Sequence, residues 1–156
     1  MIIRKAKPED TEGIADVLVQ SYNIKSVEEG IETFKNELGK NHVYIVAEED
    51  GKILGIVTWL MHGLLKHGLA ELDRIAVLPE YRGKGVAKEL FGALVEDIKK
   101  FYESKDSKLR KLYLLTHADN ARAHSFYEKM GFKLETTLKE HYYKDKDELV
   151  YTIFFD

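Results

Sequence analysis

Arg82-Gly83-Lys84-Gly85-Val86-Ala87 follows an apolar, strand-like segment that ends at Val77-Leu78-Pro79 and precedes a helical stretch over residues 87–101. The two glycines let the backbone turn tightly and approach a ligand closely. Free N–H groups in the first helical turn then point at that ligand, where the helix dipole favours negative charge. Arg82 and Lys84 add cationic side chains. The segment, called the glycine loop below, predicts a phosphate-binding site, with an ordinary strand-to-helix turn as the alternative.

The glycine loop matches neither of the two common nucleotide-binding motifs. A Walker A loop requires Gly-x-x-x-x-Gly-Lys-Ser/Thr, and a dinucleotide-binding fingerprint requires Gly-x-Gly-x-x-Gly. The pattern in this chain is Arg-x-x-Gly-x-Ala. The loop therefore indicates a phosphate-bearing ligand without identifying it.

Composition narrows the class of protein. The 156 residues suffice for one well-filled core and are too few for two ordinary domains, so we expect residues 1–156 to form a single domain. The sequence contains no run of about eighteen apolar residues, the length that a membrane span requires. We therefore expect a cytoplasmic protein. A net charge of −3 argues against nucleic-acid binding. The absence of cysteine excludes disulfides, thiolate metal sites and acyl transfer through a cysteine.

Hydrophobic periodicity predicts the element order β-α-α-β-β-β-α-β-α-β-β. Asp50-Gly51 is typical of a tight hairpin turn, and Ser26 with Glu29 is typical of a helix N-terminus. Asp10 or Thr11 is expected to cap a first helix, and Asp119 or Asn120 is expected to cap a short later helix that Gly131 closes. The other elements are expected at residues 2–7, 26–39, 42–49, 52–61, 69–78, 87–101, 112–116, 132–143 and 149–155. The order predicts an α/β (α+β) fold with a mixed sheet flanked by helices.

Two separate segments carry a distinctive combination of residues. Residues 75–87 read Ile-Ala-Val-Leu-Pro-Glu-Tyr-Arg-Gly-Lys-Gly-Val-Ala, and residues 120–132 read Asn-Ala-Arg-Ala-His-Ser-Phe-Tyr-Glu-Lys-Met-Gly-Phe. Together they resemble the phosphate loop and the Asn-x-x-Ala-x-x-Phe-Tyr-x-x-x-Gly-Phe helix of the GNAT superfamily of acetyl-CoA-dependent N-acetyltransferases. The resemblance implies a mixed, mostly antiparallel sheet of about seven strands, flanked by about four helices and splayed between the fourth and fifth strands.

Acetyl-CoA is the acyl donor that the resemblance implies. Its pyrophosphate would lie on main-chain amides of the glycine loop, contributed by Arg82, Gly83, Lys84, Gly85, Val86 and Ala87. Main-chain groups of Ile75 and Val77 would hold the pantetheine arm in the splay, and the Val77 amide would polarise the thioester carbonyl as negative charge develops there. Asn120 has two compatible interpretations, as a helix N-cap and as a hydrogen-bond partner of pantetheine.

An amine must be neutral to attack a thioester, and a lysine-like amine with a pKa of about 10.4 is almost fully protonated at pH 7. Glu71 and Asp73 alternate on the strand before the glycine loop, so they are expected to share one sheet face. The resemblance implies that Glu71 is the general base, directly or through water. Asp73 is a contact for a cationic substrate or a partner of a neighbouring Arg or Lys, and His117 is a reserve base. The alternative interpretation is that Glu71 and Asp73 are solvated surface carboxylates without a role in the reaction.

Tyr127 matches the tyrosine that donates a proton to the departing sulfur in the family that the chain resembles. Packing of Phe126-Tyr127 on a short helix is the alternative interpretation. Tyr142 and Tyr143 are candidates for the acceptor entrance. The six histidines lack the His-Glu-x-x-His spacing, so no metal site is predicted.

These observations lead to one expected function and one alternative. The expected function is direct transfer of an acetyl group, in a ternary complex, from acetyl-CoA to a primary amine on a small molecule or a protein N-terminus. The absence of cysteine removes one covalent route. The alternative is a non-catalytic acyl-CoA binder or sensor. The resemblance is also compatible with a homodimer, and neither nucleic acid nor membrane is an expected partner.

Overall fold

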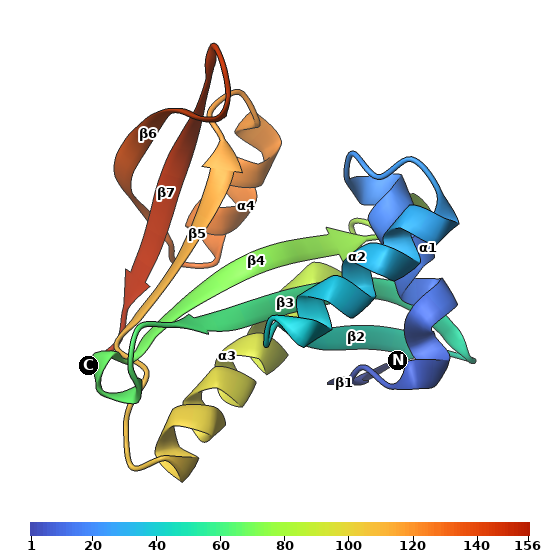
Figure 1. Cartoon of the computed structure of the whole chain (residues 1–156), viewed down its shortest axis with the longest axis horizontal. Helices are drawn as coiled ribbons and strands as arrows, with labels where there is room; N and C mark the ends of the chain where they lie inside the picture. The colour runs from blue at the N-terminus through green and yellow to red at the C-terminus, as the bar shows by residue number, and fades with distance from the viewer.

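A seven-stranded sheet runs through the computed structural model, which describes all 156 residues. The strands lie side by side in the order β1-β2-β3-β4-β5-β7-β6, and every neighbouring pair is antiparallel except β4 and β5 (Figure 1). The predicted mixed, mostly antiparallel sheet is confirmed. Its strands are β1 (Ile2–Lys5), β2 (Val43–Glu49), β3 (Lys52–His62), β4 (Leu69–Val77), β5 (Lys111–His117), β6 (Lys133–Tyr143) and β7 (Lys146–Phe154).

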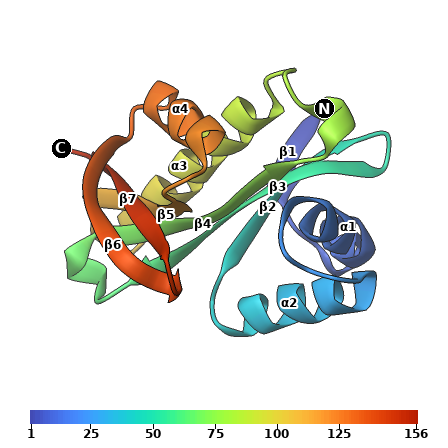
Figure 2. The same cartoon turned by 90° about the horizontal axis from the view of Figure 1, so that it is seen from above.

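Four α-helices flank the sheet, as expected, and none of them combines the length and apolarity needed to cross a membrane. α1 and α2 cover one face of the β2–β4 region, α3 covers the other face, and α4 lies beside β5 and β7 (Figure 2). Their bounds are α1 (Thr11–Ser21), α2 (Val27–Gly39), α3 (Val86–Ser104) and α4 (Ala121–Lys129).

The apolar residues divide into two clusters, one on each side of the sheet. Leu90, Leu94 and Ile98 of α3 are completely buried against one face. Ile14, Val17 and Leu18 of α1 are completely buried against the opposite face, together with Phe34 of α2. The 3.6-residue spacing of these side chains explains why the helices formed where periodicity predicted them.

The start of β7 and the end of α3 differ from the sequence-based expectation. β7 begins at Lys146 because a tight turn, in which Asp145 has a φ of +62°, pairs Tyr143 with Lys146. α3 continues to Ser104, because Tyr102 is completely buried and its hydroxyl donates a 2.8 Å hydrogen bond to the Leu69 carbonyl. Hairpin geometry and one buried tyrosine extend these elements beyond their apolar patterns.

β4 and β5 separate soon after they meet. They pair only where Leu69–Glu71 faces Lys111–Tyr113. Beyond that point β4 stays with β3 as far as Val77, while β5 stays with β7 as far as His117, and the two strands diverge (Figure 1). This divergence is called the splay below. It confirms the opening predicted between the fourth and fifth strands, and it exposes the edge of β4 that leads to the glycine loop.

Candidate active site

The glycine loop connects β4 to α3 in the conformation that its glycines predict. Gly83 has a φ of +77° and Gly85 a φ of +81°, so both occupy the left-handed region. Gly85 is the N-cap of α3, and no side chain caps this helix. A Cβ atom added at either glycine would meet no atom within 4 Å. The first N–H groups of α3 therefore border open space, as an anion site at a helix N-terminus requires.

The two cationic side chains of the loop have different surroundings. Arg82 Nε donates a 3.0 Å hydrogen bond to the Val77 carbonyl, which ties the loop to the end of β4. Lys84 is exposed, with its Nζ 5.5 Å from the centre of the Tyr81 ring. Val86 has a buried side chain, so only its main-chain amide is left for a ligand, whereas Ala87 is partly buried. Arg82 thus has a structural contact in addition to its predicted role, while Lys84 is free to meet an anion.

Main-chain groups of Ile75 and Val77 lie on the β4 edge that borders the splay. Leu78, the residue after Val77, donates its N–H to the Leu54 carbonyl of β3 at 2.8 Å. Main-chain groups of successive residues in a strand point to opposite edges, so those of Ile75 and Val77 point away from β3 and into the splay. Ile75 is already partnered there. Its N–H donates to the Tyr22 hydroxyl at 3.0 Å, and this hydroxyl donates to the Ile75 carbonyl at 3.2 Å. A pantetheine arm that binds at Ile75 must therefore displace the Tyr22 hydroxyl.

Glu71 lies at the point where β4 and β5 begin to part. Its Oε1 atom is 2.8 Å from Nε2 of His62 on β3, and the Tyr113 hydroxyl on β5 donates to the same atom at 3.5 Å. Burial raises the pKa of Glu71; the His62 hydrogen bond opposes this effect, and the charge of Asp73 adds to it. A carboxylate with a raised pKa beside a strand opening suits a general base.

A β-bulge determines where Asp73 and Arg74 point. Leu72 faces Trp59 and Arg74 faces Thr58, so Asp73 is left without a partner on β3. Both side chains consequently reach towards α2. Arg74 Nη2 lies 2.9 Å from Glu37, and Asp73 Oδ2 lies 3.4 Å from His42 Nδ1. The Arg74 guanidinium therefore pairs with Glu37, and the 3.4 Å contact with His42 is the one close contact of the Asp73 carboxylate.

The carboxylates of Glu37 and Asp73 and the imidazole of His42 have the spacing of metal ligands. One ligand atom each from Glu37, His42 and Asp73 lie within 4.8 Å of one another. Arg74, however, donates to both Glu37 carboxylate oxygens, at 3.2 to 3.3 Å from Nε and 2.9 Å from Nη2. The guanidinium supplies the positive charge that the Glu37 carboxylate needs and would repel a metal cation.

Tyr127, the candidate proton donor, lies on α4. Its ring packs edge-on against Phe132, with the ring centres 5.9 Å apart, and burial raises its pKa to about 12. A phenol with this pKa stays protonated at neutral pH, as a proton donor requires. The packing interpretation of Tyr127 and its predicted role are therefore compatible.

Asn120 and His117 have partners of their own. Asn120 is the N-cap of α4, with its Oδ1 accepting from the Ala123 N–H at 3.2 Å, which confirms the capping interpretation. His117 Nδ1 lies 2.5 Å from a carboxylate oxygen of the buried Glu148. His117 stands four residues along β5 from Tyr113, about 13 Å at about 3.3 Å per residue. It is therefore separated from Glu71 by most of the length of β5.

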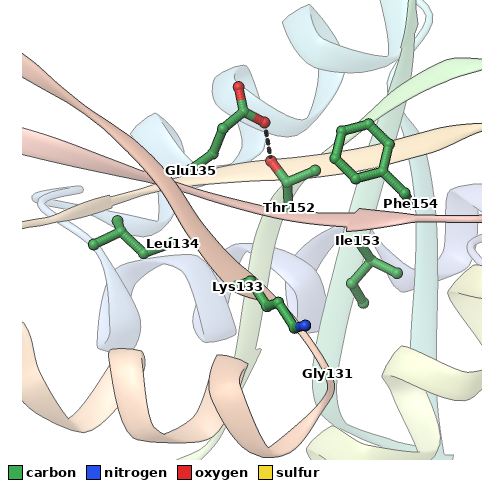
Figure 3. A pocket seen from close by; sticks show the side chains of 7 residues that line it. All are labelled: Gly131, Lys133, Leu134, Glu135, Thr152, Ile153 and Phe154. Carbon is green, nitrogen blue, oxygen red and sulfur yellow. Dashed lines mark hydrogen bonds between the residues drawn. The ribbon is translucent and has the colours of Figure 1, made fainter.

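A separate hollow of about 310 Å³ lies at the C-terminal hairpin, and no predicted site residue lines it (Figure 3). Within it, the Thr152 hydroxyl donates a 2.7 Å hydrogen bond to Glu135. Its lining residues are Gly131, Lys133, Leu134, Glu135, Thr152, Ile153 and Phe154. The hollow therefore belongs to a different part of the surface from the splay and the glycine loop.

Sequence reasoning missed Tyr22 and His62. The sequence patterns assign no site role to either residue. The structure brings Tyr22 to the open edge of β4 and His62 to Glu71. The polar tip of Tyr22 at a helix end was the only local sign that its hydroxyl needs a partner.

Comparison of the sequence with known proteins identifies the family. The model of the acetyltransferase (GNAT) family matches residues 11–132. A ribosomal protein bS18-alanine N-acetyltransferase of Haemophilus influenzae is 31% identical over 111 residues, which cover 71% of this chain and 68% of that protein. An N-alpha-acetyltransferase of Sulfurisphaera tokodaii is 30% identical over 115 residues, which cover 67% of this chain and 64% of that protein.

The fold agrees with that assignment. The crystal structure of an aminoglycoside 6′-N-acetyltransferase complexed with coenzyme A has a TM-score of 0.80 at 15% identity, and the match covers 99% of this chain and 97% of that one. The chain belongs to the acetyltransferase (GNAT) family. It is an acetyl-CoA-dependent acyltransferase.

Proposed function

We propose that this protein transfers the acetyl group of acetyl-CoA directly to a primary amine while both substrates are bound. The observation that carries the proposal is the position of Glu71, a mostly buried carboxylate with a raised pKa at the opening of the splay. Tyr127 on α4 is protonated at neutral pH. The chain therefore offers a base for the attacking amine and an acid for the departing sulfur.

The residues of this chain divide the work of binding. The uncapped start of α3 and the exposed Lys84 fit the pyrophosphate of acetyl-CoA, because both offer positive electrostatic potential beside open space. The edge of β4 at Ile75 and Val77 fits an amide-bearing arm, because its main-chain groups are directed away from β3. Asn120 keeps its side-chain N–H₂ group free for the same arm while its Oδ1 caps α4.

The proposed reaction begins when Glu71 takes a proton from the ammonium group of the acceptor. The neutral amine attacks the thioester carbonyl, and the Val77 N–H stabilises the negative charge that develops on the carbonyl oxygen. The carbon–sulfur bond breaks, and Tyr127 donates its proton to the departing sulfur. The nitrogen, which became positively charged in the attack, loses its extra proton to the Tyr127 phenolate through water, and Glu71 releases its proton to solvent. The products are an N-acetylated amine and CoA.

The acceptor is a small amine or a protein N-terminus. The relative in Haemophilus influenzae is named for alanine of a ribosomal protein, and the structural neighbour is named for aminoglycosides, so the family context supports both classes. The carboxylate of Asp73, which has a 3.4 Å contact with His42, lies on the same side as Glu71 and favours an acceptor that carries positive charge.

Thermal unfolding with and without acetyl-CoA tests the proposal, followed by an assay of CoA release over a panel of amines. A ligand at about 100 times its dissociation constant stabilises the native state by about 2.7 kcal/mol. For a chain of this size the midpoint is expected to rise by about 5–10 °C. A rise with CoA release supports the enzyme. A rise without CoA release for any amine supports the non-catalytic sensor, and no rise at saturating acetyl-CoA contradicts both.

Removal of the Tyr22 hydroxyl is expected to destabilise the free protein and to increase the stabilisation by acetyl-CoA. In Tyr22→Phe the Ile75 N–H and carbonyl lose their partner, which costs about 1–3 kcal/mol. The pantetheine arm then restores these hydrogen bonds without displacing a phenol. Thermal unfolding at matched acetyl-CoA concentrations measures both effects.

Tyr44→Phe is the matched control for the Tyr22 variant. It deletes another largely buried phenol hydroxyl, one that donates to Glu37 at 2.6 Å on the α2 side. This control is expected to lose stability while its acetyl-CoA shift equals that of the wild type. If Tyr22→Phe behaves in the same way as the control, the arm does not use the main chain of Ile75.

A further inference from the structure

We propose that His62 is the positioning residue for Glu71: it holds Oε1 of the carboxylate, so that Oε2 is the atom that takes the proton from the acceptor amine. This inference rests on the proposed function, because it assigns the atom of Glu71 that acts. His62 itself does not touch either substrate in this scheme, and no proton passes through it.

Two strands hold the same oxygen of Glu71 from opposite sides. Glu71 lies between Leu60 of β3 and Tyr113 of β5 in the sheet. His62, two residues beyond Leu60, reaches back to place Nε2 at 2.8 Å from Oε1, and Tyr113 donates to Oε1 at 3.5 Å. No protein group bonds Oε2. A carboxylate held by one oxygen presents the other oxygen in a defined direction, as a general base requires.

The exposure of the two side chains supports this division of roles. The side chain of Glu71 is 15% exposed and that of His62 is 35% exposed, so the carboxylate is mostly buried and its imidazole partner is the more accessible of the two. The imidazole and Tyr113 rings lie with their centres 5.6 Å apart, which restricts the imidazole in addition to the hydrogen bond. These contacts fit a His62 side chain that orients a mostly buried base.

His62 has a second effect on Glu71, because its hydrogen bond lowers the pKa of the carboxyl group. The groups that act on the pKa of Glu71 are His62 from β3, Asp73 from β4 and Tyr113 from β5, and the charge of Glu71 in turn raises the pKa of Tyr142 on β6. Burial and Asp73 raise the pKa of Glu71, whereas the hydrogen bonds from His62 and Tyr113 lower it. Loss of the His62 hydrogen bond therefore leaves Glu71 protonated up to a higher pH, which removes the active form of the base in the lower part of the pH range.

The test compares His62→Phe, which keeps a ring and removes the donor, with His62→Gln, which restores an N–H donor. For His62→Phe we expect kcat to fall by about tenfold or more and the acidic limb of the kcat/KM profile to move to higher pH. His62→Gln is expected to recover most of both effects. The KM for acetyl-CoA is expected to stay unchanged in both variants, because His62 lies on the acceptor side.

His67→Phe is the matched control, because it removes a histidine whose Nδ1 accepts a 2.9 Å hydrogen bond from the Leu64 N–H in the adjacent turn. This variant is expected to alter stability and to leave the acidic limb in place. If His62→Phe also leaves kcat and the acidic limb unchanged while Glu71→Gln abolishes transfer, the positioning role is overturned and the proposed function stands. If Glu71→Gln is fully active, Glu71 is not the base, and both that part of the proposed function and the positioning role of His62 fail.

Discussion

Glu71→Gln is expected to lower kcat/KM by about 10²- to 10⁴-fold, the usual contribution of a general base. Glutamine keeps the size of the side chain and an oxygen that accepts from His62, but it takes no proton from an amine. The variant is therefore expected to retain the acetyl-CoA-induced rise in the unfolding midpoint. Steady-state kinetics of CoA release, combined with thermal unfolding, separate loss of transfer from loss of binding.

The pH profile of kcat/KM provides an independent readout of the same variant. Burial raises the pKa of Glu71 above its ordinary value, and the deprotonated form is the active base, so kcat/KM rises as pH increases through that pKa. Glu71→Gln is expected to remove this acidic limb. An acceptor amine titrates as well, at a pKa of about 8 to 10.4, and its limb persists in the variant.

Asp73→Asn is the matched comparison for Glu71→Gln. Burial also raises the pKa of Asp73, and its carboxylate lies two residues along β4. We expect Asp73→Asn to raise the KM of a cationic acceptor and to leave the acidic limb in place. The opposite pattern, in which Asp73→Asn loses the limb and Glu71→Gln keeps it, would make Asp73 the base.

The order of elements and the glycine loop were predictable from local sequence. The stripes of α1 and α3 bury the residues that their spacing selects, and Asp50-Gly51 makes the turn that joins β2 and β3. Gly83 and Gly85 both adopt positive φ angles, as a tight loop of this kind requires. These features depend on neighbours within one or two turns of the chain, so a single sequence suffices to predict them.

The contacts around the splay were not predictable in the same way. Tyr22 meets Ile75 across 53 residues of sequence, and no local pattern records such a contact. The bulge at Asp73 breaks the alternation on which strand predictions depend, so it turns Arg74 towards α2 and its partner Glu37. His62 was one histidine among six until strand pairing placed it beside Glu71. Tertiary register, not composition, assembles the surroundings of the candidate base.

Gly85→Leu is expected to abolish the acetyl-CoA-induced rise in the unfolding midpoint. A Cβ atom at Gly85 would meet nothing within 4 Å, so the added side chain enters the open space beside the first N–H groups of α3. If that space holds the pyrophosphate, the leucine fills it and the anion loses its hydrogen-bond donors. Transfer of the acetyl group is expected to fall with binding, in contrast to Glu71→Gln, which is expected to lose transfer alone.

Gly51→Leu separates occupation of the loop from backbone strain. Gly51 has a φ of +79° and Gly85 a φ of +81°, and a Cβ atom at Gly51 also meets nothing within 4 Å. Leucine at either position carries a left-handed backbone, which costs about 1–2 kcal/mol and lowers the midpoint in both variants. Only Gly51→Leu, in the β2–β3 turn, is expected to keep the full shift with acetyl-CoA. Equal shifts in the two variants would place the pyrophosphate away from the start of α3, whereas loss in Gly85→Leu alone would assign it to the glycine loop.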